Sequence, residues 1–304
     1  MTTLPTLNLQ NFLHGSPTEQ QQFVQSLGQV LETVGFFALE HHGIEAKLIQ
    51  SAYAAAADFF SLPDTIKQNY ERPDINQQRG FTRFGQEHAK NSNAPDLKEF
   101  WHVGREAELA NPWPHEVLQF EPSMSGLYEQ LETCAAHLLK ACARYLELPP
   151  TFFDEEARQG KSILRILHYP PLSDTMPPKS LRAAPHEDIN LITLLCESTG
   201  PGLELLNSDG SWVAIESLPG QIIVDTGDML QALTNGVFKS TTHRVVNLDG
   251  RSRRFSLPFF MHPRPEFDLT PISECVERTG GQPKFPAQTA GQYLQQRLQE
   301  IGLA

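Results

Sequence analysis

The part of the chain that follows residue 162 consists of short apolar runs broken by turn-forming pairs, and this pattern constrains the fold most strongly. Short runs that are rich in β-branched and aromatic residues and end in turns are typical of antiparallel strands. Asp209-Gly210, Pro219-Gly220 and Asp249-Gly250 are three such turn pairs. The pattern therefore predicts a sandwich or jelly-roll barrel, with strands at residues 163–169, 186–196, 203–206, 212–215, 221–226, 241–248 and 254–261.

The first part of the chain has the spacing of amphipathic helices instead. Ser16 followed by Pro17 is a helix start, and apolar residues then recur at helical intervals as far as Val34. Further helices are predicted at 45–60, 124–146 and 287–301, with a short strand at 35–39. The predicted fold class is mainly β with flanking helices, and one such core can take up all 304 residues as a single catalytic unit.

Charge and composition narrow the class of protein. A formal net charge of -12 argues against a protein that binds nucleic acid or a membrane surface, because both need clustered Lys and Arg. No apolar run approaches the roughly 20 residues of a membrane helix, and the N-terminus lacks a signal-peptide pattern. The 4 scattered cysteines predict free, buried thiols in the cytoplasm. Without a heptad repeat or an exposed apolar stripe, we expect a monomer.

The candidate chemistry begins with His186 and Asp188, at the start of a predicted strand. Residues two apart in a strand share a face, so these two side chains would project together. A single His-x-Asp triplet can equally be a surface turn, and His243 alone can be a core histidine. Together, two imidazoles and one carboxylate form the facial triad of non-heme iron(II) oxygenases, which leaves metal positions open. We therefore expect His186, Asp188 and His243 to be catalytic metal ligands.

Arg254 and Ser256 lie on the next predicted strand, 11 residues beyond His243. They also share a face, so a guanidinium and a hydroxyl could hold one carboxylate inside the barrel. Arg254 could otherwise be a surface charge beside Arg251 and Arg253. Its offset from His243 favours the carboxylate clamp.

With these residues, the chain resembles the isopenicillin N synthase-like family of 2-oxoglutarate and iron(II)-dependent dioxygenases over nearly its whole length. The family pattern of His-x-Asp, a distant His and Arg-x-Ser is matched in order by His186, Asp188, His243, Arg254 and Ser256. Family-typical flanking segments are also present: Gly35-Phe36-Phe37, His42-Gly43-Ile44, Arg79-Gly80-Phe81, Asp96-Leu97-Lys98-Glu99-Phe100 and Gly227-Asp228-Met229-Leu230-Gln231.

The resemblance implies a double-stranded β-helix core at residues 121–304, which includes the C-terminal helix, and an N-terminal extension at 1–120 on the substrate side. It implies Fe(II), 2-oxoglutarate as co-substrate and O2, with release of succinate and CO2 and oxidation of a small-molecule substrate by hydroxylation, desaturation or ring closure. It also implies that Tyr169 binds 2-oxoglutarate. Many relatives have Asn two residues before that Tyr, whereas this chain has Leu167, and His168 could face away.

For the prime substrate, the resemblance points to Phe81, Arg83, Trp101, His102 and Tyr293. Arg83 would suit an anionic substrate, although a surface arginine is the commoner role. Residues 77–93 and 171–185 are polar, Pro-containing loops, and either could be a lid or a solvated connection.

Two other functions fit the same residues. An oxidase that uses the triad without 2-oxoglutarate, as isopenicillin N synthase does, would keep the Arg-x-Ser pair. A non-catalytic barrel that binds a metal or a small carboxylate would usually have lost a ligand, and here every ligand is present.

Overall fold

Two β-sheets and a set of flanking helices make up the computed structural model, which describes residues 4–87, 96–107, 109–172, 181–216, 218–248 and 251–300. In the larger sheet the strand order is β1-β2-β10-β7-β13-β5-β4-β3, and β12 also pairs with β5. Its strands are β1 (Thr6–Asn8), β2 (Phe36–Glu40), β3 (Gly80–Thr82), β4 (Glu99–Gly104), β5 (Ile163–Tyr169), β7 (Ile192–Cys196), β10 (Ile222–Thr226), β12 (Arg254–Ser256) and β13 (Pro258–Met261).

The smaller sheet has the order β6-β11-β8-β9. Its strands are β6 (Ala183–His186), β8 (Leu203–Leu206), β9 (Trp212–Ala214) and β11 (His243–Val245). An apolar cluster joins the two sheets, since Phe36, Ala38 and Ile223 of the larger one meet Leu203 and Leu205 of the smaller one. This sheet-on-sheet arrangement with flanking helices confirms the predicted fold class.

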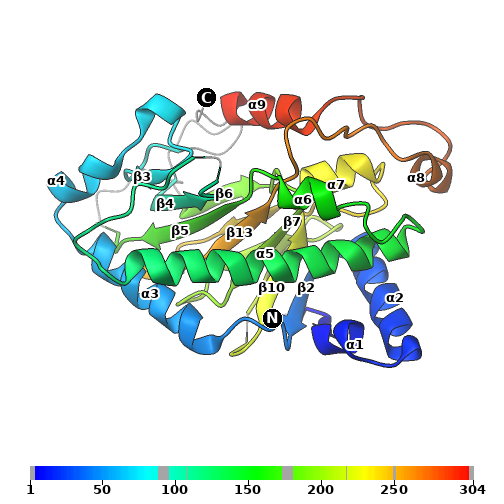
Figure 1. Cartoon of the computed structure of the whole chain (residues 1–304), viewed down its shortest axis with the longest axis horizontal. Coiled ribbons are helices and arrows are strands. Elements are labelled where there is room, and N and C mark those ends of the chain that lie inside the picture. Colours follow the sequence, from blue (N-terminus) through cyan, green and yellow to red (C-terminus); the bar gives the residue numbers. More distant parts are fainter. Residues whose placement is uncertain are drawn as a thin grey trace.

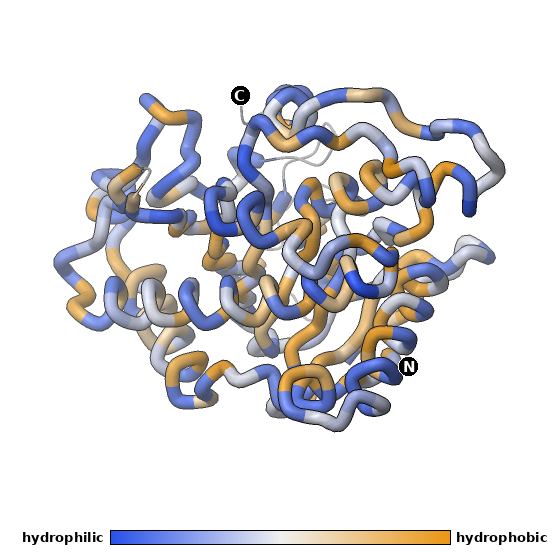
Figure 2. Tube along the Cα trace, turned by 45° about the vertical axis from the view of Figure 1, so that its right-hand side comes forward, coloured by the Kyte–Doolittle hydropathy of each residue, from blue (hydrophilic) through white to orange (hydrophobic). Residues whose placement is uncertain are grey.

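Helices cover the other face of the larger sheet. In Figure 1 the long helix α5 runs across the strands, with α3 and α2 beside it and α9 at the rim. Helical residues face the sheet through one continuous apolar core, and the tube in Figure 2 is mostly orange along these buried segments and blue in the outer loops. The helices are α1 (Leu9–Leu13), α2 (Pro17–Thr33), α3 (Ala46–Phe60), α4 (Asp64–Lys67), α5 (Phe120–Tyr145), α6 (Asp154–Arg158), α7 (Asp228–Leu233), α8 (Ser273–Arg278) and α9 (Ala290–Glu300), with 3-10 turns η1 (Gln68–Tyr70) and η2 (Pro73–Ile75).

The start of helix α2 follows from local chemistry. Ser16 accepts a hydrogen bond from the Glu19 amide and the Glu19 carboxylate accepts one from the Ser16 amide, so α2 begins with a capping box. The second predicted helix also forms, as α3. The third, α5, starts earlier than predicted, at Phe120, because that buried side chain belongs to the same core.

Two predicted strands are wrong in their continuity. Residues 186–196 form the end of β6, a connection and then β7, and the two strands belong to different sheets. Residues 254–261 form β12 and β13, which are separated at Leu257. β12 and β13 are both largely buried, so the apolar run of residues 254–261 carries no signal for the interruption at Leu257.

The N-terminal part contains more than the predicted helices and the short predicted strand. The unpredicted strand β4 is buried along its whole length and pairs with β5. Of the two loops considered as lids, residues 88–93 of the first and 173–180 of the second lie outside the described residues, as does the predicted Asp249-Gly250 turn.

Candidate metal centre and substrate cavity

Paired strands bring the two histidines together. His186 on β6 and His243 on β11 are direct cross-strand partners, and their ring centres lie 4.4 Å apart. His186 Nδ1 lies 2.7 Å from the Ala184 carbonyl oxygen and His243 Nδ1 lies 3.2 Å from the Thr241 carbonyl oxygen. A ring nitrogen that meets a carbonyl oxygen is the protonated one, so each Nε2 keeps its lone pair.

Asp188 completes the cluster from the connection between β6 and β7. Its Oδ1 lies 3.8 Å from His186 Nε2 and 3.7 Å from His243 Nε2. His186 and Asp188 do not share a strand face as predicted, because His186 is the last residue of β6. The side chains meet because the chain turns there and the Asp188 carbonyl accepts a 2.7 Å hydrogen bond from the Asp228 amide.

Buried neighbours hold the Asp188 carboxylate. Thr193 donates a short hydrogen bond to its Oδ2. Asp225, on β10, is buried beside it, and burial together with the Asp188 charge raises the Asp225 pKa well above its usual value. The Asp188 carboxylate and burial therefore both disfavour ionisation of Asp225.

The cluster has the chemistry of a metal site. One ligand atom from each of His186, Asp188 and His243 lies within 4.8 Å of the others. Burial, and then the neighbouring His186 ring, lower the His243 pKa to about 4, so its imidazole is neutral at pH 7. Two imidazoles and one carboxylate on one side of a metal are the donor set of non-heme iron(II) oxygenases, and these residues fit it.

The residues of the predicted carboxylate clamp also lie together. Arg254 on β12 is opposite Tyr169 on β5, and its guanidinium carbon lies 5.0 Å from the Tyr169 ring centre. Arg254 Nη1 donates to Ser256 Oγ at 3.3 Å, and all three side chains are buried. Leu167, opposite Ser256, packs against Tyr169 and gives this part of the site an apolar wall. His168 faces away from Tyr169, since it contacts Glu99 and stacks on Phe255.

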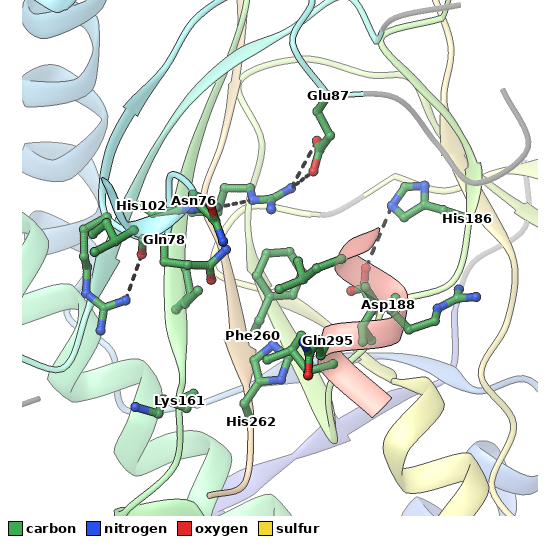
Figure 3. Close-up of a pocket in the computed structure, with 18 of the residues that line it drawn as sticks. Asn76, Gln78, Glu87, His102, Lys161, His186, Asp188, Phe260, His262 and Gln295 are labelled. Atoms are coloured by element: carbon green, nitrogen blue, oxygen red, sulfur yellow. Dashed lines mark hydrogen bonds and ion pairs between the residues drawn. The ribbon is translucent and has the colours of Figure 1, made fainter. Parts of the chain in front are cut away.

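A cavity of about 860 Å³ opens beside the triad and is lined by His186 and Asp188. Figure 3 shows it between these two residues and the β4 residue His102, with Phe260 and Gln295 in the middle of the view. Helix α9 forms one wall, and the Tyr293 hydroxyl donates to Asp228 Oδ2 at 2.9 Å. Arg254, Ser256 and Tyr169 are not among the described residues that line this cavity.

Of the five substrate candidates, the structure places only His102 at the cavity wall. Trp101 faces the opposite side of β4, where it packs on Phe59, and its register partner Phe81 lies on that same aromatic side. Strand alternation explains the difference, because neighbouring residues point to opposite faces. Arg83 is exposed and pairs with Glu71 at 2.7 Å. Tyr293 points to Asp228 and not into the cavity.

Several cavity residues were missed by reasoning from the sequence. Arg165 is the most informative, because it stands four residues before Tyr169 on β5 and therefore on the same face of that strand. A charged residue in an otherwise apolar strand was the available signal. The other missed lining residues include Asn76, Gln78, Glu87, Lys98, Phe260, His262 and Gln295.

Two family models and several known proteins match the chain. Residues 4–123 match the family model described as non-haem dioxygenase in morphine synthesis N-terminal, and residues 160–263 match that of the 2OG-Fe(II) oxygenase superfamily. A 2-oxoglutarate-dependent dioxygenase of Didymella fabae is 30% identical, over 91% of this chain and 90% of the relative. A 2-oxoglutarate-Fe(II) type oxidoreductase of Metarhizium rileyi is 31% identical, over 96% and 90%.

Solved structures show the same fold. A full-length Neurospora crassa protein, crystallised in complex with alpha-KG, superposes with a TM-score of 0.89 at 27% identity, over 97% of this chain and 95% of that one. A 2OG-Fe(II) oxygenase family protein of Caulobacter crescentus superposes with a TM-score of 0.86 at 35% identity, over 99% of both chains.

Proposed function

The chain belongs to the 2OG-Fe(II) oxygenase superfamily, and we propose that His186, Asp188 and His243 hold the iron with which it oxidises a small molecule. It is an oxidoreductase that uses Fe(II), 2-oxoglutarate and O2. The observation that carries the assignment is the convergence of the three ligand atoms within 4.8 Å. Iron bound there supplies open coordination positions and the oxidising chemistry.

The side chains of this protein orient the metal ligands and supply the charge that binds the co-substrate. The backbone carbonyls of Ala184 and Thr241 fix the tautomers of the two histidines, so that each Nε2 faces Asp188. In our proposal Arg254 and Ser256, with Tyr169 beside them, bind the far carboxylate of 2-oxoglutarate. Support comes from the burial of Arg254, whose charge has no carboxylate partner among the described residues.

The assignment is tested with the anaerobic Fe(II)-loaded protein. We expect 2-oxoglutarate to produce the visible charge-transfer band of a chelated keto acid. His243→Ala should remove iron binding and the band together. Arg254→Ala should keep iron and weaken 2-oxoglutarate binding by about tenfold to a hundredfold, because a charged hydrogen-bond partner is lost.

Arg253→Ala is the matched control, since the neighbouring Arg253 is exposed and donates to Ser61 Oγ. It should leave both iron and 2-oxoglutarate binding unchanged. An unchanged band in Arg254→Ala would refute the clamp. Bound iron without any band in the wild type would instead favour the oxidase that works without 2-oxoglutarate.

We further propose that residues 1–120 form the substrate-side part and 121–304 the core of one catalytic unit, which acts as a monomer in the cytoplasm. The β2–β10 and β4–β5 pairs, which join the two parts in one sheet, support a single unit. All four cysteines are buried and unpaired, which supports a reducing compartment. No helix among the described residues is long and apolar enough to cross a membrane.

A further inference from the structure

Arg165 has a fixed position at the cavity wall. Its Nε donates to His102 Nε2 at 2.7 Å, and its Nη1 donates to the Glu87 carboxylate at 3.0 Å. The guanidinium carbon also lies 4.5 Å from the Phe100 ring centre and 5.5 Å from that of Phe260. Two hydrogen bonds and two aromatic rings therefore hold the guanidinium in one orientation.

The third guanidinium nitrogen of Arg165, Nη2, remains available. No described residue accepts a hydrogen bond from Arg165 Nη2, and the side chain is 17% exposed and lines the cavity. Because the other two nitrogens of this guanidinium are already hydrogen-bonded, Nη2 is an oriented donor. Nη2 can donate to an oxygen of a molecule in the cavity.

Arg165 belongs to an ion-pair network whose own charges are balanced. Lys98 Nζ pairs with Glu87 at 2.6 Å and with Asp96 at 2.8 Å, so two cations and two carboxylates form one closed network. Burial alone would raise the Glu87 pKa, but Arg165 and Lys98 hold it well below its usual range, and Glu87 stays ionised. A second carboxylate at Nη2 would lie close to Glu87 and be repelled. The site therefore favours an uncharged carbonyl oxygen.

His102 fixes the arginine through its own tautomer. Burial, and then Arg165, hold the His102 pKa well below its usual value, so the ring is neutral. Its Nδ1 donates to the Gln77 carbonyl at 2.9 Å, which leaves Nε2 to accept from Arg165. Gln77 and Asn76 both have left-handed backbones, with φ of 56° and 50°. This uncommon turn places the Asn76 and Gln78 amides at the cavity.

The β13 part of the cavity wall, next to Arg165, is aromatic. Phe260 and His262, two residues apart, both line the cavity, whereas Phe259 and Met261 point into the core. His262 is 8% exposed and its Nδ1 has no partner among the described residues. Gln295 of α9 adds another amide, which can both donate and accept. An aromatic face with amides around it suits a flat ring that carries both C=O and N–H groups.

We propose that Arg165 anchors the substrate of this oxygenase, by donating from Nη2 to a carbonyl oxygen of a small, uncharged, flat ring that lies against Phe260. His102 is its positioning residue. The inference rests on the proposed function, because it places this ring beside the His186, Asp188 and His243 iron site.

The test uses the anaerobic protein loaded with Fe(II) and 2-oxoglutarate, and ligand-observed NMR to measure the binding of matched ring compounds. The neutral members are uracil, 2-pyridone and nicotinamide, and the charged ones are orotate and nicotinate. We expect the neutral rings to bind more tightly than their carboxylates. Arg165→Met should weaken the neutral rings by about tenfold to a hundredfold and leave the 2-oxoglutarate band unchanged.

Three further variants separate anchoring from a general structural effect. Arg264→Met, which removes a guanidinium that pairs with Glu156 away from the cavity, should leave ring binding unchanged. His102→Phe should weaken the neutral rings as Arg165→Met does, whereas His102→Gln, which retains an acceptor, should restore part of the affinity.

The proposal is overturned by tighter binding of the carboxylates, by ring binding that does not depend on Arg165, or by no binding of any neutral ring. Loss of the 2-oxoglutarate band in Arg165→Met would also overturn it, because Arg165 would then serve the co-substrate. A wild type that binds iron without forming the band would contradict the proposed function instead, and the ring measurements would still report on Arg165.

Discussion

Burial keeps three histidines of this molecule neutral. His102, His243 and His262 all have lowered pKa values, and burial is the largest cause for each. A neutral imidazole can accept a hydrogen bond or a metal through one nitrogen while the other donates. The metal cluster and the Arg165 anchor both depend on that property.

His262 makes a testable contribution to stability against pH. Burial lowers its pKa to about 4 in the folded state, against an ordinary value of 6.5. Between these values the unfolded chain binds a proton that the folded chain excludes, so stability falls as the pH drops from 6.5 to 4. The full effect is roughly 3 kcal/mol. His262→Gln should show a shallower loss of unfolding free energy over this range in denaturant titrations, and an identical slope would contradict the assignment.

At the scale of elements, the packing of α2 on α5 depends on one glycine. A Cβ on Gly28 would lie 2.1 Å from the Tyr145 ring, whereas a Cβ on Gly126 in α5 would meet only Leu48, at 3.5 Å. Alanine is intrinsically better than glycine in a helix by about 1 kcal/mol. Because α2 and α5 approach closely at Gly28, alanine is disfavoured there, whereas at Gly126 the intrinsic preference for alanine holds.

The two alanine variants are therefore expected to differ in sign. Gly126→Ala should raise the free energy of unfolding by about 0.5–1 kcal/mol. Gly28→Ala should lower it by about 1–3 kcal/mol, because the Tyr145 ring has to move. Urea denaturation of both variants measures the difference. Stabilisation by Gly28→Ala would show that the two helices can separate without cost.

At the scale of the whole molecule, the surface of the described residues favours a monomer. Their large exposed apolar side chains, Phe84, Leu118, Leu218 and Leu248, come from four separate connections, and single exposed apolar residues are ordinary on monomers. The net charge of -12 adds repulsion between copies. Sedimentation equilibrium should give a mass of 34.1 kDa that does not change with protein concentration. A mass of twice that value would contradict the proposal.

The sequence by itself determined the fold class and most of the elements, because periodicity and capping are local. The 17–33 and 46–60 helices and the 163–169 strand follow from the spacing of their apolar residues, and the 17–33 helix also from its capping box. It also indicated the chemistry of His186, Asp188, His243 and Arg254, since few folds carry those residue types in that order.

Only the tertiary structure decided how these residues meet and which of their neighbours face the cavity. The break between β6 and β7, the β4–β5 register and the turn at Asn76 all arise from contacts between segments far apart in the chain. That register places His102 opposite Arg165 and turns Trp101 to the other side. Apolar periodicity distinguishes the faces of a strand only where one of them meets water, and β4 is buried on both.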